Sequence, residues 1–256
     1  MRSISCALVA FALAMAVAVP ALGRNEEENW DRCLQPDKVG PLEPDDVIEA
    51  CRFVLRMDFI RPNVRNDAFN NIGVAEMRLH KTDEAIHAFD EALRKIKELP
   101  DVREVRQLGN YTRRNRAIAY VATKQYDKAL DDVDKMAATE AIPEYLALRC
   151  LYHSLYDDNF ASALPDCQKA VDQDPKKAGD AYAAFLIVEY RQGKYEDVKN
   201  DCKLVREKAE LSPDAMYVCG LAERRLGNAD LARAMLPLAD AMDNRVAERF
   251  KELGIE

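Results

Sequence analysis

Histidine occurs at three positions, and the surroundings of each favour a structural or surface role over catalysis. His87 precedes Asp90 and Glu91 by three and four residues, so one face of a helix could present all three to a metal ion. The same spacing is common on solvated helices, and we expect no metal there. His80 falls at an expected turn, whereas His153 falls on an expected helix that could face a groove.

Motifs that carry known chemistry are missing from the sequence. It contains no phosphate-binding loop, nucleophile elbow, His-Glu-x-x-His motif or EF-hand loop. Asp131, Asp132 and Asp134 form a carboxylate cluster, which we expect on a solvent-facing helix. We therefore predict no catalytic residue, no metal and no cofactor. An enzyme or a small-ligand carrier stays an alternative, because a groove between helices can frame a site.

Cysteine is the reactive residue type with the most regular spacing. Beyond Cys6 the chain has six cysteines, which fall into three pairs of almost equal internal spacing: Cys33 and Cys51, Cys150 and Cys167, and Cys202 and Cys219. Six cysteines allow 15 disulfide connectivities. A zinc site is not expected, because the chain has no Cys-x-x-Cys pair and no histidine close to two cysteines.

The composition is that of an acidic, helical, folded chain. Its 256 residues are 48% hydrophobic and 32% charged, with a net charge of −8, which argues against disorder. The acidic balance disfavours binding to nucleic acid or to anionic lipid, since both need a basic face. An aromatic content of 7% favours helices over a β-sandwich.

The N-terminal segment 1–23 has the three-part layout of a secretory signal peptide. A short basic start containing Arg2 precedes an apolar run over residues 4–19, and Ala21 and Gly23 are small residues before a cleavage site. The alternative is a membrane anchor, but the run is short of the roughly 20 residues that a spanning helix needs. We predict cleavage near Gly23, release of a mature chain without a membrane span, and an oxidising periplasmic or extracellular location.

A helix-turn-helix pattern recurs along the rest of the chain. Residues 115–136 give two amphipathic helices around a short turn, and similar units precede and follow it. Equivalent small or branched residues mark the second helices; they are Ala85, Ala129, Ala163, Val198 and Ala232. Subtraction of their numbers gives intervals of 44, 34, 35 and 34. A period this constant indicates an array of stacked helix pairs, and the longer first interval predicts a lengthened helix and connector around residues 94–107.

This period and pattern resemble the tetratricopeptide repeat. The small residue of the motif's first helix matches Gly73, Ala117 and Gly220, and the aromatic residue before the second helix matches Tyr126 and Tyr195. The resemblance implies an all-α, right-handed solenoid of about five to six helix-turn-helix repeats with a C-terminal capping helix.

The same pattern divides the part of the chain after the signal peptide into three segments. We expect residues 24–65 to form a degenerate first helical unit and residues 66–243 to form the repeat array. Within residues 244–256, Val246, Phe250 and Leu253 form one apolar stripe on a final helix, which we expect to cover the last repeat.

The register of the repeat narrows the cysteine pairing. It places Cys150 and Cys167 on facing helices of one unit, and Cys202 and Cys219 on neighbouring helices of successive units. In the degenerate unit, Cys33 and Cys51 fall on facing helices, as Cys150 and Cys167 do. We therefore predict Cys33–Cys51, Cys150–Cys167 and Cys202–Cys219; unpaired cysteines that merely fill the core are the alternative.

The resemblance also implies a concave groove lined by the first helices of the units, where a protein or peptide binds. The groove candidates by register are Asn70, Asn71, Arg114, Asn115, Tyr145, Arg149, Tyr152, Ala183 and Tyr217. Arg114 and Arg149 are cations in consecutive units, and tyrosine and arginine are enriched at interfaces. An incomplete match to a carboxylate clamp, at Asn115 and Arg149, leaves a full clamp unsupported.

The chain is similar to exported tetratricopeptide proteins of Gram-negative bacteria, through Trp30 followed by Cys33 and through the Glu49–Cys51 segment. The resemblance implies a non-catalytic scaffold in the bacterial periplasm that binds a partner protein or peptide in its groove. A self-assembling structural adaptor that uses its convex face or its ends is the first alternative.

Overall fold

The computed structural model describes residues 24–157 and 160–256, and within them it contains helices and no strand. The predicted signal peptide lies outside the described residues. The helices are α1 (Arg24–Leu34), α2 (Pro36–Val39), α3 (Pro44–Arg56), α4 (Pro62–Arg78), α5 (Thr82–Ile96), α6 (Arg103–Ala122), α7 (Tyr126–Thr139), α8 (Pro143–Tyr156), η1 (Phe160–Ala163), α9 (Leu164–Gln173), η2 (Pro175–Lys177), α10 (Gly179–Arg191), α11 (Tyr195–Lys208), α12 (Pro213–Arg225), α13 (Ala229–Met242) and α14 (Val246–Glu252).

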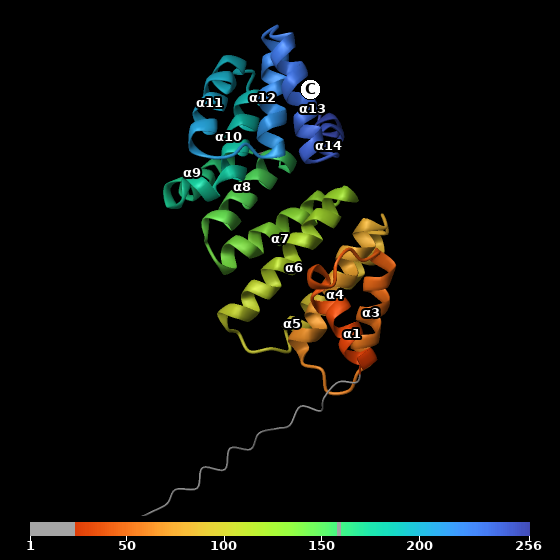
Figure 1. The fold of residues 1–256 in the computed structure, drawn as a ribbon. Helices are drawn as coiled ribbons and strands as arrows, with labels where there is room; N and C mark the ends of the chain where they lie inside the picture. Colours follow the sequence, from red (N-terminus) through yellow and green to blue (C-terminus); the bar gives the residue numbers. More distant parts are fainter. Residues whose placement is uncertain (1–23, 158–159) are drawn as a thin grey trace, which may run out of the picture.

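The helices stack as successive antiparallel pairs into an elongated array (Figure 1). The pairs are α1 with α3, α4 with α5, α6 with α7, α8 with α9, α10 with α11, and α12 with α13. Each pair packs on the next, so the buried apolar residues form a chain of adjoining clusters along the array. The predicted all-α solenoid of helix-turn-helix units is confirmed.

Local sequence signals fix where many of these helices begin. Several α-helices start with a proline, whose fixed φ suits the first helical turn and whose missing N–H needs no partner there: Pro36, Pro44, Pro62, Pro143 and Pro213. At α12 the Ser212 hydroxyl also accepts a hydrogen bond from the Ala215 N–H at 3.3 Å. These signals fix where these particular helices begin without help from other units.

The turn inside four of the pairs repeats one unusual backbone conformation. His80, Lys124, Gly193 and Gly227 all have a positive φ, of 58°, 58°, 75° and 82°. They occupy equivalent positions in their units, since the second helix starts at the next residue but one in every case. The left-handed conformation reverses the chain tightly, so the two helices of a pair pack as an antiparallel hairpin.

Two glycines allow the helices of a pair to approach closely. A Cβ atom at Gly73 would lie 2.5 Å from the Phe89 ring, and one at Gly220 would lie 2.8 Å from Leu236. Both glycines match the small residue of the repeat motif. The small residue at this position of the motif is therefore explained by the close contact between the two helices of one unit.

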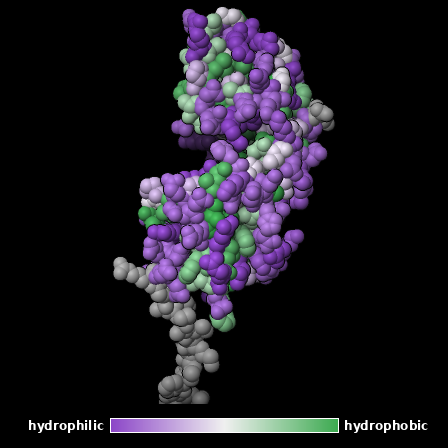
Figure 2. Space-filling view, turned by 90° about the vertical axis from the view of Figure 1, so that its right-hand side faces the viewer, coloured by the Kyte–Doolittle hydropathy of each residue, from purple (hydrophilic) through white to green (hydrophobic). Residues whose placement is uncertain are grey.

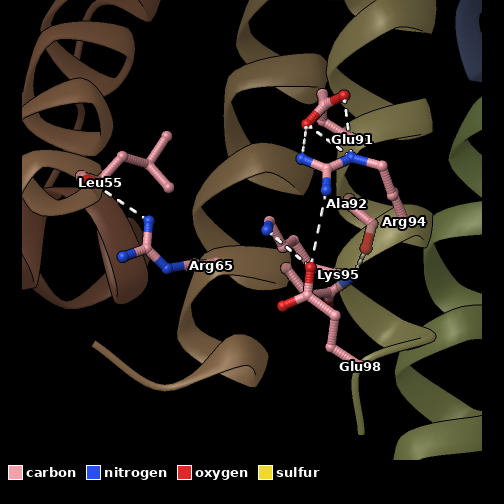
Figure 3. Close-up of polar contacts among 8 residues, drawn as sticks. Leu55, Arg65, Glu91, Ala92, Arg94, Lys95 and Glu98 are labelled. Atoms are coloured by element: carbon pink, nitrogen blue, oxygen red, sulfur yellow. Dashed lines mark hydrogen bonds and ion pairs between the residues drawn. The ribbon is translucent and has the colours of Figure 1, made fainter. Parts of the chain in front are cut away.

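The longer interval before the third pair corresponds to a lengthened α6 and its connector, as predicted. α5 ends at Ile96, and α6 begins at Arg103 and runs for 20 residues. Figure 3 shows the end of α5, where Arg94 pairs with Glu91 and Glu98, and Lys95 pairs with Glu98 at 2.7 Å. Basic side chains in this last turn also complement the helix dipole.

The structure brings the six cysteines together in the three pairs that the register predicts. The Cα–Cα separations are 4.7 Å for Cys33–Cys51, 5.4 Å for Cys150–Cys167 and 6.1 Å for Cys202–Cys219. All three lie in the range that disulfides span. The first two pairs join helices of one unit, and the third joins neighbouring units.

The carboxylate cluster on α7 is not fully solvent-facing, which corrects the expectation from sequence. Asp132 has no exposed surface, and its two carboxylate oxygens accept hydrogen bonds from Arg116 at 2.6 and 2.8 Å. Asp131 remains exposed. The sequence could not separate the two, because the partner of Asp132 comes from α6.

The final helix does more than cover the last repeat. Val246 and Phe250 of α14 are fully buried, and α14 packs on α12 and α13 as expected. In addition, Glu252 pairs with Lys124 at 2.9 Å, in the turn between α6 and α7. α14 therefore crosses from the last unit back to the third pair (Figure 1). Among the described residues, no helix is both long and apolar enough to span a membrane.

Candidate partner-binding groove

A cavity of about 140 Å³ marks the place where the first helices of three units converge. Arg114 comes from α6, Tyr145 and Leu148 from α8, and Asp180 from α10, with Lys177 at the rim. Arg114 is exposed, and its guanidinium has no hydrogen bond or ion pair within the described part of the chain. The cavity therefore offers a free cation beside an aromatic ring and a carboxyl group.

Two carboxyl groups line the cavity, Glu144, which pairs with Lys177 at 3.2 Å, and Asp180. The pKa of Asp180 is raised to about 6, mainly by burial and also by the charge of Asp214, against the opposing charge of Arg114. Asp214 is itself held by Arg249 of α14, at 2.6 Å. Asp180 is therefore half-buried in this cavity, and it forms no ion pair with any of the described residues.

The exposed face of α6 continues this surface. Tyr111, Arg114 and Ile118 are three and four residues apart and so lie on one face of the helix. Tyr111 is 57% exposed and Ile118 is 37% exposed. On α4, Val74 and Arg78 are exposed one turn apart. Large apolar side chains interspersed with arginines are typical of a protein-binding surface.

Figure 2 shows one face of the molecule. The molecule is hollowed between its N-terminal and C-terminal parts, and apolar side chains gather in a band on the N-terminal part of this face. The surrounding surface is hydrophilic. An accessible hollow with apolar side chains nearby is suited to a polypeptide ligand.

All three predicted asparagines are engaged within the fold, and Asn70 is buried. The Asn115 side chain donates a hydrogen bond to Asn70 at 3.1 Å, which ties α6 to α4. The Asn71 side chain donates to the backbone carbonyl of Cys33 at 2.8 Å, which ties α4 to α1. Both bonds stabilise the stacking of units, so these amides could contact a partner only through their remaining groups.

Arg149 does not join Arg114 in one cationic pair. Its guanidinium lies 2.6 Å from Asp166 of α9, and the side chain is 23% exposed. It therefore links the two helices of its own unit. Of the two arginines predicted to face the groove, only Arg114 lines the cavity, because the helical phase of α8 turns Arg149 toward α9.

The predicted tyrosines differ in accessibility. Tyr145 is half-buried in the Arg114 cavity. Tyr152 is 9% exposed and contacts Tyr156 edge to face at 5.5 Å. Tyr217 packs against Phe250 of α14 at 5.0 Å. The C-terminal part of the groove is therefore filled by α14, whereas the part near α4, α6 and the start of α8 stays open.

Sequence reasoning missed Asp180 and the exposed residues Tyr111 and Ile118. One signal was present, since Asp180 and Asp214 follow Tyr145 at intervals close to one and two repeat periods. The register that selected Tyr145 could therefore have selected both aspartates. Ala183, another groove candidate, is fully buried, because α8 and α12 pack against α10.

The histidines hold structural positions. His153 lies between two carboxylates, with Nδ1 3.0 Å from Asp157 and Nε2 3.1 Å from Asp134. His80 is the left-handed turn residue described above, and His87 is exposed on α5. Within the described residues, no three histidine, cysteine or acidic side chains are grouped as metal ligands would be.

Comparison with solved structures identifies the fold. A tetratricopeptide repeat protein from Parabacteroides merdae superposes with a TM-score of 0.56 over 91% of this chain and all of its own, at 17% sequence identity. The resemblance to the tetratricopeptide repeat is thereby confirmed for the fold. YrrB, described as a TPR protein with an unusual peptide-binding site, gives a TM-score of 0.41 at 19% identity over 72% of this chain and 91% of its own.

Comparisons at the level of sequence add no relative. Neither the protein-family models nor the curated proteins contain a match to this chain.

Proposed function

We propose that this solenoid, which has the fold of tetratricopeptide repeat proteins, is a non-catalytic scaffold that binds a segment of a partner protein in its open groove. The cavity where Arg114, Tyr145 and Asp180 converge carries the proposal. It supplies a free cation for a partner's carboxylate, an aromatic surface, and a carboxyl group that can accept a partner's N–H. The exposed apolar residues of α6 supply contact area beside it.

The proposed location is the bacterial periplasm. The N-terminal signal pattern supports export. Three cysteine pairs at disulfide distance are consistent with an oxidising compartment, since cytosolic proteins seldom keep such bonds.

The test compares groove variants with an outer-surface control in cells. Partners are captured by cross-linking to the parent chain, to Arg114→Glu and to Ile118→Glu. Arg233→Glu on α13 is the matched control, because that side chain is 75% exposed and lies far along the array. We expect at least a tenfold loss of the captured partner for the groove variants and none for the control. Equal capture by all four chains would contradict groove binding.

A stripe on the outer helix α13 supports a second candidate, self-assembly through the end of the array. Leu231, Leu238 and Met242 are 52%, 51% and 48% exposed and lie on one face of the helix, seven and four residues apart. If copies associate through this stripe, the mass in solution rises with concentration and Leu238→Glu abolishes the rise. A monomeric mass at all concentrations would exclude this candidate.

A further inference from the structure

A second cavity, of about 250 Å³, lies between α10 and α11. Its lining residues come from one face of each helix, at intervals of three, four and seven residues. They are Tyr182, Phe185, Leu186 and Glu189 of α10, and Asp201, Leu204, Val205 and Lys208 of α11. We call this cavity the α10–α11 slot; none of these residues lines the Arg114 cavity.

The slot has ends of opposite character. The two helices form an antiparallel hairpin, so Glu189 and Asp201 lie toward the turn, and Tyr182 and Lys208 lie toward the other end. Seven residues separate the two ends on each helix, which corresponds to about 10 Å along the axis. One end is therefore acidic, and the other combines a hydroxyl group with an ammonium group.

Each end contains a buried polar atom that has no protein partner. Oε2 of Glu189 and the hydroxyl oxygen of Tyr182 are both inaccessible within the fold and make no hydrogen bond there. Tyr182 as a whole is 8% exposed. A buried polar atom without a partner costs about 1–3 kcal/mol, so a ligand that satisfied both atoms would recover that energy.

A bound cation would stabilise the ionised carboxylates at the acidic end. The pKa of Glu189 is raised to about 7, mainly by burial, also by the negative charges of Asp201 and Asp197 and by a hydrogen bond with Asp201, against the opposing charge of Lys194. An ammonium group placed there would favour the ionised carboxylate. Binding would then release a proton near neutral pH.

The middle of the slot is apolar. Leu186 and Val205 are buried at its floor, while Phe185 is half-buried and Leu204 is 49% exposed at its wall. An alkyl chain could lie along this surface and shield Leu204 from water.

We propose that the α10–α11 slot binds a linear amphoteric small molecule, with its ammonium group at Glu189 and Asp201, its alkyl chain along Leu204, and its carboxylate at Tyr182 and Lys208. This site is independent of the partner-binding groove.

The probe is 8-aminooctanoate, whose two charged groups are separated by an alkyl chain that matches the slot. Octylamine and octanoate are one-ended controls. In NMR titrations of the parent chain at pH 7, we expect saturable shifts at α10 and α11 amides, with a Kd of about 0.1–1 mM for the probe. Octylamine should bind at least about threefold more weakly, and octanoate at least about tenfold.

Variants test the two ends separately. Glu189→Gln should weaken the probe about tenfold, and Tyr182→Phe about threefold, without changing octylamine affinity in the latter case. Glu207→Gln, an exposed change on α11, is the matched control and should have no effect. Circular dichroism and thermal melting verify that each variant is folded.

Binding by the parent should also be tighter at pH 8 than at pH 6, because Glu189 is then ionised. Two results would overturn the proposal: no saturable shift up to about 10 mM probe, a level about tenfold above the weakest Kd expected, or binding that neither end variant weakens. Equal affinity for octanoate and the probe would also overturn it, since the acidic end would then play no part.

Discussion

Several buried charges among the described residues are paired across helices. Arg116 is the clearest case, since it binds the fully buried Asp132 and also contacts Asp90 at 2.5 Å. This link joins three helices of neighbouring units, α5, α6 and α7. Buried ion pairs of this kind add little stability over an apolar pair, but they are strongly destabilising when one partner is removed.

We therefore expect Arg116→Met to lower the free energy of unfolding by about 3–5 kcal/mol, because it leaves Asp132 buried without a partner. The companion variant Asp132→Leu should cost less, because Arg116 keeps its contact with Asp90, and the double variant Arg116→Met, Asp132→Leu should recover part of the loss. Urea denaturation of the four chains measures this. Additive effects of the single changes would show that the two side chains are not coupled.

The free energy of unfolding should depend on pH through the carboxyl group of Asp180. Its pKa is about 6 in the folded state, against 3.8 when unperturbed. Because burial raises the pKa of Asp180 in the folded state, ionisation of this group lowers the free energy of unfolding. This loss is absent below pH 4, grows as the pH rises from 4 to 6, and is complete above pH 6. Asp180→Asn should thus raise the stability at pH 7.5 by about 1–2 kcal/mol, after the lost interaction with the helix dipole is subtracted.

The gain from Asp180→Asn should disappear as the pH approaches 4, and urea melts at pH 4, 6 and 7.5 measure it. Asp127→Asn, an exposed change in the first turn of α7, is the control and should give no gain at any pH. A stabilisation by Asp180→Asn that is the same at all three pH values would contradict the assigned cause.

At the scale of the element, four of the described helix pairs share a left-handed turn, and two of these pairs also have a close helix contact at a glycine. Gly73 and Gly220 provide the contact, and the turn position is glycine in two units but histidine or lysine in two others. A side chain in the left-handed conformation costs about 1 kcal/mol or more. The units with a non-glycine turn therefore carry local strain that the other units do not.

Gly73→Ala should lower the free energy of unfolding by about 1–3 kcal/mol, because its Cβ atom would overlap the Phe89 ring and force the two helices apart. Gly179→Ala is the matched control, since its nearest neighbour would be 3.8 Å away. The control should be neutral or slightly stabilising. If both variants melt alike, close contact is not the reason for glycine at position 73.

His80→Gly should raise the stability by about 0.5–1 kcal/mol, because glycine adopts the positive φ of this turn without steric conflict. His87→Gly in the interior of α5 should have the opposite sign, by about 0.5–1 kcal/mol, because glycine weakens a helix. Thermal melts of the two variants decide whether the turn is strained. A loss of stability in both would argue that it is not.

At the scale of the molecule, the array is closed by its own last helix. α14 fills the C-terminal part of the groove through Phe250 and reaches the third pair through Glu252. Repeat arrays normally transmit stability only between neighbours. Here one short helix adds a contact between units that are distant in sequence.

Phe250→Ala should lower stability by about 3–5 kcal/mol through the cavity it leaves. Hydrogen exchange should then accelerate in α12, α13 and α14, and also at the turn around Lys124, while α1 to α4 keep their protection. Lys124→Ala should accelerate exchange at that turn without the large loss of stability. Unchanged exchange around Lys124 in both variants would show that the bridge does not hold the two parts together.

The sequence by itself determined the repeating unit. Period, turn position, proline starts and cysteine register are local properties, so the helix pairs and the pairing of Cys150 with Cys167 could be predicted from residues close in the chain. The groove candidates followed only in part, since Arg114 and Tyr145 share a cavity while Arg149 turns to Asp166. An error of one residue in the assumed repeat register changes the predicted direction of a side chain by about 100°, which is enough to move it out of the groove.

Only the tertiary structure decided which residues of different units meet. The burial of Asp132, the approach of Asp180 to Arg114, and the crossing of α14 to Lys124 depend on angles between units that accumulate along the array. No local pattern encodes such angles, because each results from the packing of whole helices. The open groove and the α10–α11 slot are consequences of that packing, and so is the chemistry that we assign to them.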